Sequence, residues 1–224
     1  QYLKQENQGY ASIPDPIDEG EQRRLLRSLM NVRYPGHASA EYEKLQDELL
    51  QEEAEEKGIV TCNDIPVIEQ EYPCSEIKNS DRISLWRGDI TRLGVDAIVN
   101  AANSQLLGCF VPCHGCIDNA IHSAAGIQLR NECAEIMAGL AVTEKQKEQL
   151  KSCYLNCLKL AEKTGIKSIA FCCISTGEFH FPNKLAAEIA VDTVDRFLTK
   201  TNIERVIFNV FKEQDFNIYK KLFC

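Results

Sequence analysis

The chain of 224 residues lacks any apolar run that approaches the roughly 18 residues of a membrane-spanning helix. It also lacks the charged and then apolar start of a secretory signal, because it opens on the mainly polar stretch QYLKQENQGY. Neither an internal repeat nor a low-complexity tract is present. These absences predict a cytoplasmic protein that makes no membrane contact.

Basic residues are in deficit. The chain has 25 Lys and Arg against 33 Asp and Glu, which gives a formal net charge of −8. Because this balance cannot neutralise a run of phosphates, we expect no nucleic-acid partner. A small nucleotide ligand remains compatible, since backbone N–H groups can bind a few phosphates without cationic side chains.

Cysteine, by contrast, is abundant, with 11 residues. In a chain of this length without an export signal we expect reduced thiols rather than disulfides. Cys172 and Cys173 lie in the apolar run SIAFCCI, where a thiol behaves as a small buried hydrophobic group. The cysteines around His114 are not in such a run and need another explanation.

Residues 1–80 are predicted to form a helical, peripheral extension. Apolar residues recur at helical spacing in EGEQRRLLRSLMN and again in SAEYEKLQDELLQEEAEEKG. In the second of these helices Ser39 is a candidate N-cap and Gly58 a candidate stop signal. Residues 59–80 carry two prolines and mixed polarity, and therefore form a connector.

The pattern changes at residue 81, and residues 81–224 are predicted to form one α/β domain. Apolar segments typical of strands are RISLWRGDI, VDAIVNAAN, SIAFCCIST and RVIFNVF. Helical patterns alternate with them and include NKLAAEIAVDTVDRFL, for which Asn183 is the candidate N-cap. Strands that alternate with helices indicate a layered domain with a largely parallel sheet.

A cluster of metal-ligand residues occurs in GCFVPCHGCIDNAIH, where Cys109, Cys113, His114 and Cys116 lie within eight residues. Thiolates and imidazoles are preferred zinc ligands. One alternative is a group of reduced thiols without a metal, and another is a closed structural zinc site completed by His122 or a more distant residue. Three protein ligands would instead leave a fourth position open, as in catalytic zinc sites.

Two further segments have the pattern of a ligand site at the carboxyl ends of strands. Asn100 and Asn103 follow an apolar strand in VNAAN, and their amides could bond ribose hydroxyls. Ordinary turn chemistry is the alternative. In ISTGEF, small residues at the end of a buried strand could present backbone N–H groups to a diphosphate, although a simple glycine turn also fits.

Taken together, these segments resemble the macrodomain family. RGDI, DAIVNAAN and ISTGEF stand in the family's order, and GCFVPCHGCIDNAIH is similar to the loop of its zinc-containing microbial subgroup. That subgroup also carries an N-terminal helical extension like RRLLRSLMN and LQDELLQEE. The resemblance covers nearly the whole chain, and it implies a three-layer α/β fold with a mixed, largely parallel central sheet.

The resemblance implies an ADP-ribose site. Asp89 would accept a hydrogen bond from the adenine amino group, Ile90 would pack beside it, and Asn103 would bind the distal ribose and assist catalysis. Two segments would enclose the diphosphate and distal ribose, namely the backbone of Cys116, Ile117 and Asp118 and the loop of Ser175, Thr176, Gly177, Glu178 and Phe179.

The resemblance also implies a metal and a reaction. Cys109, His114 and Cys116 would hold Zn²⁺ near the distal ribose, with Cys113 as a non-ligand in the same loop. Members of this subgroup resemble hydrolases of protein ADP-ribosylation, of the glycosidase or esterase type, often paired with a sirtuin-type ADP-ribosyltransferase. Asp118 is a candidate general base, and helix capping is its alternative role.

Two other classes of function stay open at this point. The same pocket would serve a non-catalytic reader that binds ADP-ribose on a partner and uses zinc structurally. A redox or metal-buffer protein built on the cysteines is a third class, but it leaves VNAAN and ISTGEF unexplained.

One departure from the family pattern stands out. Between Met137 and Thr143, where the family carries a longer segment with a strand of the type NLPxKYVxHTVGP, this chain has only AGLAV. Either the natural chain holds further residues at this point, or the chain is truly shortened and its sheet altered. An intact mass well above 25.3 kDa would identify the first case.

Overall fold

The computed structural model describes residues 2–103, 105–137, 146–176 and 181–224. They belong to two compact units, each built from two stretches of the chain. The first unit combines Gln1–Lys57 with Ala102–Val142, and the second combines Gly58–Ala101 with Thr143–Cys224. The N-terminal helices are therefore folded together with a segment from the middle of the sequence.

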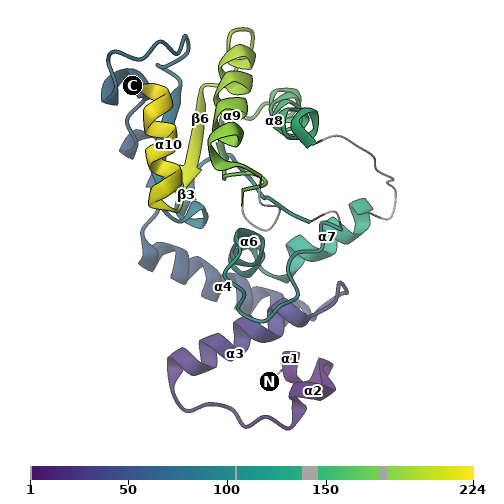
Figure 1. Ribbon diagram of the computed structural model, residues 1–224. Helices are drawn as coiled ribbons and strands as arrows, with labels where there is room; N and C mark the ends of the chain where they lie inside the picture. The colour runs from purple at the N-terminus through teal and green to yellow at the C-terminus, as the bar shows by residue number, and fades with distance from the viewer. Residues whose placement is uncertain (1, 104, 138–145, 177–180) are drawn as a thin grey trace. The chain divides into compact units, whose positions relative to one another are not determined.

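Helices are the regular elements in the described residues of the first unit. A buried apolar cluster of Leu3, Leu29, Met30 and Ile127 joins the early helices to the later ones, and α3 also packs against α6. Figure 1 shows these elements in purple, blue and teal. They are α1 (Tyr2–Glu6), α2 (Gln8–Ala11), α3 (Glu19–Val32), α4 (Ala40–Lys57), α6 (Ile117–Ala125) and α7 (Ile127–Met137).

The ends of α4 are set by the residues that the sequence indicated. Ser39 Oγ accepts a hydrogen bond from Tyr42 N at 3.2 Å, which is the N-cap arrangement. The helix stops at Lys57, and the next residue, Gly58, has a φ of +77°. Both predicted signals are confirmed.

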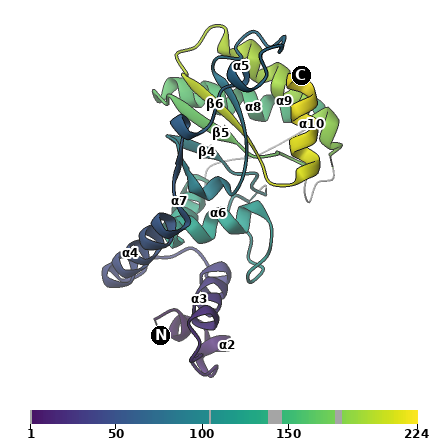
Figure 2. The same ribbon diagram turned by 90° about the vertical axis from the view of Figure 1, so that its left-hand side faces the viewer.

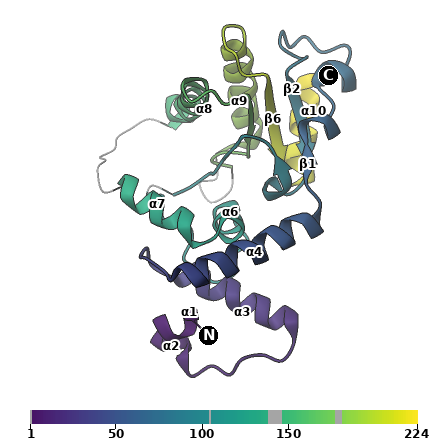
Figure 3. The same cartoon turned by 180° about the vertical axis from the view of Figure 1, so that it is seen from behind.

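The second unit is built on a parallel sheet with the strand order β2-β6-β5-β4. Register pairs such as Ile83 with Val206 and Ile98 with Ala170 align its strands, and β2 lies at one edge beside β6 (Figure 3). The strands are β2 (Ile83–Arg87), β4 (Ala97–Val99), β5 (Ser168–Phe171) and β6 (Arg205–Val210), and a separate parallel pair is formed by β1 (Val60–Thr61) and β3 (Leu93–Gly94).

Three helices cover one face of this sheet. The chain passes from β4 through β5 to β6 in one direction across the sheet, and the intervening helices α8 and α9 pack against each other. α10 packs beside α9 and contacts β2, and the three helices lie side by side in Figures 1 and 2. The helices of this unit are α5 (Ile68–Glu71), α8 (Gln146–Lys163), α9 (Asn183–Leu198) and α10 (Glu213–Phe223), with short 3-10 turns η1 (Cys62–Asp64) and η2 (Ile90–Arg92).

Aromatic side chains fill the space between the sheet and this helical layer. The Tyr154 and Phe171 ring centroids lie 4.9 Å apart, and those of Phe208 and Tyr219 lie 5.2 Å apart. All four side chains are buried. This packing accounts for the apolar residues on the face of β5 and β6 that carries Phe171 and Phe208.

Some boundaries differ from the sequence prediction. β5 ends at Phe171 rather than running on to residue 176, because the chain enters a turn in which Ser175 takes a φ of +66°. Pro182, not Asn183, occupies the N-cap of α9, and the Asn183 amide instead donates to Asp215 Oδ1 at 2.5 Å. The shortened segment AGLAV lies outside the described residues. No helix in the described part of the chain is both long and apolar enough to cross a membrane.

Candidate functional site

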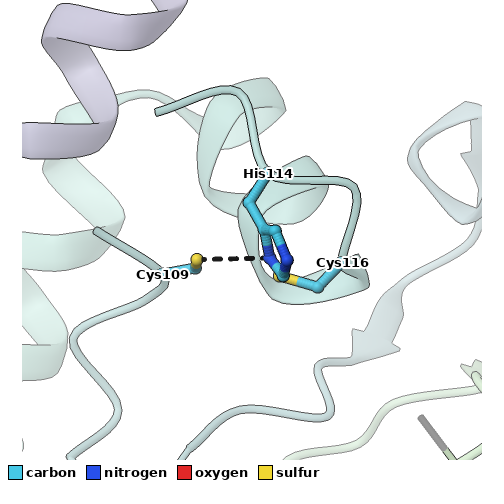
Figure 4. A group of neighbouring side chains, drawn as sticks. All are labelled: Cys109, His114 and Cys116. Carbon is cyan, nitrogen blue, oxygen red and sulfur yellow. Dashed lines mark hydrogen bonds between the residues drawn. The ribbon is translucent and has the colours of Figure 1, made fainter. Parts of the chain in front are cut away.

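The three predicted metal ligands come together in the first unit. One ligand atom each from Cys109, His114 and Cys116 lies within 4.8 Å of the other two, and Cys109 Sγ is 3.6 Å from His114 Nδ1. Figure 4 shows the two thiols and the imidazole turned toward a common point at the start of α6. This group could hold a metal ion. Cys113 is not part of this group.

Cys116 also begins helix α6. It is the N-cap residue, and its Sγ accepts the backbone N–H of Asn119 at 3.4 Å. Burial raises the pKa of the Cys116 thiol, with a further contribution from Cys109, so the metal-free thiol is held in its protonated form. A bound cation would displace that proton, because the thiolate is the form that ligates metals.

Asp118 and His122 form a buried pair on α6. Asp118 Oδ1 lies 3.6 Å from His122 Nε2, and the two residues are 6 % and 5 % exposed. Burial lowers the pKa of His122, and nearby Arg130 lowers it further, whereas Asp118 acts in the opposite direction. The imidazole is therefore neutral at pH 7. His122 is not a member of the metal-ligand group.

Asn103 lies at the start of the loop that carries the metal ligands. Its Nδ2 donates to Gly108 O at 3.3 Å, and its Oδ1 accepts from Gln105 N at 2.9 Å. These are the turn interactions that the sequence left open as an alternative to ligand binding. Asn103 is an exposed residue, so its amide is accessible from solvent.

Asp89 and Ile90 belong to the second unit, directly after β2. Asp89 caps η2, since its Oδ1 accepts from Thr91 N at 3.0 Å and from Thr91 Oγ1 at 2.8 Å. Ile90 is 1 % exposed and anchors this turn in the core. Both bonds end on one carboxylate oxygen of a residue that is only half-buried.

The ISTGEF segment also belongs to the second unit. Ser175 has a left-handed backbone, and its carbonyl accepts from Phe181 N at 3.0 Å. Thr176 Oγ1 donates to Cys173 O at 3.2 Å. A non-glycine residue at positive φ is strained, which is common in segments that bind ligands. The remaining predicted residues Gly177, Glu178 and Phe179 lie outside the described residues.

The structure thus groups the predicted residues in two sets. The three candidate metal ligands, Ile117, Asp118 and Asn103 belong to the first unit, and the other described site residues belong to the second. Sequence reasoning missed Asn119, which is fully buried and whose Nδ2 donates to Val111 O at 3.0 Å within the metal-ligand loop. Asn119 lies three residues after Cys116, the position whose backbone N–H bonds the N-cap side chain, and this spacing is the sequence feature that could have indicated it.

The chain is similar to a known protein family and to named relatives. The family model described as Macro domain matches residues 99–144 and 137–190. A protein-ADP-ribose hydrolase of Treponema medium is 45 % identical over 255 aligned positions, which cover 99 % of this chain and 95 % of that protein. Another, from Staphylococcus aureus strain MRSA252, is 40 % identical over 89 % of this chain and 84 % of its own length.

A solved structure shares the fold. The Trypanosoma brucei macrodomain in complex with ADP-ribose superimposes with a TM-score of 0.63 and 32 % identity, over 73 % of this chain and 76 % of that one. The segment between Met137 and Thr143 is also where this chain departs from its relatives. The alignment with the Treponema medium protein has 255 positions, more than the 224 residues of this chain, so it contains gaps in this chain. The two stretches matched by the family model overlap at residues 137–144, and the break in the match therefore lies in this segment.

Proposed function

The chain belongs to the macro domain family, and from that premise we propose that it is a zinc-dependent hydrolase that removes ADP-ribose from mono-ADP-ribosylated proteins. The hydrolase activity is supported by its Treponema medium and Staphylococcus aureus relatives, which are both named protein-ADP-ribose hydrolases. The observation that carries the metal dependence is the convergence of Cys109, His114 and Cys116.

The donor atoms of this group fit zinc. In a tetrahedral site with Zn–S of about 2.3 Å and Zn–N of about 2.05 Å, neighbouring sulfur and nitrogen ligands lie about 3.6 Å apart. The separation of Cys109 Sγ and His114 Nδ1 is 3.6 Å. Cys109, His114 and Cys116 would hold the ion and leave one position open, and zinc bound there would supply Lewis acidity to the reaction.

The proposed ligand is ADP-ribose, which the solved Trypanosoma brucei macrodomain also holds. Asp89 Oδ2, the carboxylate oxygen that Thr91 does not contact, accepts a hydrogen bond from the adenine amino group. Ile90 forms the apolar wall beside it. The backbone at residues 116–118 and the loop at residues 175–179 bind the diphosphate through N–H groups. The positive φ of Ser175 supports this role, since it turns successive amides away from the regular strand direction.

The proposed reaction is attack of water on the glycosidic or acyl carbon that joins ADP-ribose to a protein side chain. Asn103 orients the distal ribose, because its amide can both donate to and accept from ribose hydroxyls. Asp118 takes a proton as the water oxygen bonds to that carbon, and the bond that joins ADP-ribose to the side chain breaks. The departing atom keeps the bonding electrons and takes up the proton that Asp118 received. The neutral His122, 3.6 Å from Asp118, places no positive charge beside that carboxylate.

The wider setting is part of the same proposal. Residues 81–224 form the macrodomain and residues 1–80 its extension, the protein works in the cytoplasm, and a sirtuin-type transferase makes the modification that it removes. The structure pairs none of the eleven cysteines in a disulfide, and all of them lie in the described residues.

One assay tests the function directly. Peptides with ADP-ribose on Glu, Asp, Ser or Arg are incubated with the protein, each with and without a chelator, and free ADP-ribose is measured. We expect release from at least one linkage and loss of that release with the chelator. Binding without release would identify a reader, and release that the chelator leaves unchanged would exclude a catalytic metal.

A further inference from the structure

The loop that carries the metal ligands has an irregular backbone. Leu106, Gly108 and Cys113 all take left-handed φ values, of 58°, 78° and 51°. Within the loop, His114 N donates to Val111 O at 3.2 Å. A loop of this kind keeps one shape only if other parts of the protein hold its polar groups.

Helix α3 supplies one of these supports through Asn31. Its side chain is 1 % exposed, and its Oδ1 accepts the backbone N–H of Cys113 at 2.9 Å. Its Nδ2 donates to Ser123 Oγ at 3.0 Å, which in turn donates to Asn119 O at 2.7 Å. One amide of the extension therefore ties the metal-ligand loop to helix α6.

Arg27, one helical turn earlier on α3, holds the other end of the loop. Its Nη2 donates to Asn119 Oδ1 at 2.7 Å and to the carbonyl of the ligand residue His114 at 3.3 Å. Asn119 then donates its Nδ2 to Val111 O. Because Arg27 can only donate and a carbonyl can only accept, these two contacts fix the orientation of the Asn119 amide.

Arg130 on α7 completes the support. Its guanidinium is buried, and Nη1 donates to the carbonyls at the end of α3, including Asn31 O at 2.9 Å. Nε donates to Leu107 O at 2.7 Å, and Nη2 reaches the carbonyl of the ligand residue Cys109 at 3.5 Å. The end of α3 and the start of the loop are thus held by one side chain.

We propose that helix α3 is a structural part of the metal site, with Arg27 and Asn31 as positioning residues that set the arrangement of the three ligands. This inference rests on the proposed metal site, not on hydrolysis. The contacts of Arg27 end on Asn119 and on the carbonyl of the ligand residue His114, and that of Asn31 ends on the backbone of Cys113. Asn119 in turn bonds the carbonyl of Val111. Loss of such outer contacts typically weakens metal binding 10- to 100-fold.

The test compares two arginines of the same helix. Arg27→Met removes the contacts to the loop, whereas Arg23→Met removes an ion pair with Glu53 on α4 and leaves the loop untouched. Zinc affinity is measured by competition with a chelating dye, and the ligand geometry by the visible spectrum of the Co²⁺-loaded protein. Circular dichroism confirms that each variant is folded.

We expect Arg27→Met to weaken zinc binding at least tenfold and to change the Co²⁺ spectrum, with partial recovery in Arg27→Lys. Arg23→Met should match the wild type in both. Asn31→Ala provides a second variant with the same expected result should Arg27→Met fail to fold. If Arg27→Met and Asn31→Ala fold and keep the zinc affinity and the Co²⁺ spectrum of the wild type, the inference is overturned but the metal site is not. A wild-type protein that binds neither ion would overturn the metal site itself.

Discussion

Gly108 faces the imidazole ring of His122 so closely that a Cβ on Gly108 would lie 2.7 Å from His122 Cδ2. Gly108 also has a φ of +78°, in the region that favours glycine. This position therefore tolerates no side chain for two separate reasons. Because His122 is buried on α6, it cannot simply move into solvent.

We predict that Gly108→Ala lowers the free energy of unfolding by about 2–3 kcal/mol, from backbone strain and from the displaced ring. Chemical denaturation measures this loss. Gly115→Ala is the matched control, because its added Cβ has no atom of the described residues within 4 Å apart from its chain neighbours. Equal stability of the two variants would contradict the close packing of Gly108 on His122.

A second prediction concerns the metal ligands. His114→Ala should abolish zinc binding and turnover, while ADP-ribose affinity stays within about tenfold of the wild type, because the nucleotide is held by other residues. Metal content and calorimetry provide the measurements. Cys113→Ala removes a thiol from the same loop that is not in the ligand group, and it should retain its zinc. Full turnover in His114→Ala would exclude a catalytic metal.

Asp89→Ala should weaken ADP-ribose binding by about 1–3 kcal/mol, through loss of the adenine hydrogen bond. The carboxylate also caps η2, so some stability is lost as well. Asp64→Ala separates the two effects, because Asp64 caps a similar turn by accepting from Thr61 N at 2.8 Å but has no proposed ligand role. Calorimetry should show unchanged affinity for Asp64→Ala, and unchanged affinity for Asp89→Ala would refute the adenine assignment.

Stability should fall at alkaline pH because of a buried thiol. Burial raises the pKa of Cys172 from 9.0 to about 11. Between these values the unfolded chain has lost this proton and the folded protein retains it, so the folded state becomes less favoured as pH rises. The stabilising effect is complete below pH 9 and is lost through pH 11, at about 1.4 kcal/mol per pH unit.

Urea unfolding between pH 8 and pH 11 measures this dependence. Cys172→Ala should be less stable at pH 8 because of the small cavity that it leaves, but its stability should decline less steeply with pH. An identical pH dependence in the two proteins would show that other groups are responsible.

The sequence indicated the Cys/His cluster because its members are local. Cys109, Cys113, His114 and Cys116 lie in one short loop, and the structure brings together Cys109, His114 and Cys116, the three residues that the family resemblance implied. The cap at Ser39 and the stop at Gly58 were predicted for the same reason, since helix ends depend on a few neighbouring residues.

The support of that loop could not be predicted. Arg27 and Asn119 are 92 residues apart, and neither has a local pattern that indicates the other. The helices at residues 19–57 were interpreted as peripheral because their own spacing shows only an apolar stripe. Which later segment covers that stripe is decided by tertiary packing, and here it is the segment that contains Ile127.

The divided composition of the first unit has a consequence for protein synthesis. A ribosome that has made residues 1–57 has produced the apolar face of α3, with Leu29 on it, before Ile127 exists. At about 5–20 residues per second, several seconds pass before the matching half emerges. During that interval the cluster of Leu3, Leu29 and Met30 lacks Ile127, and a chain that ends before residue 102 never acquires it.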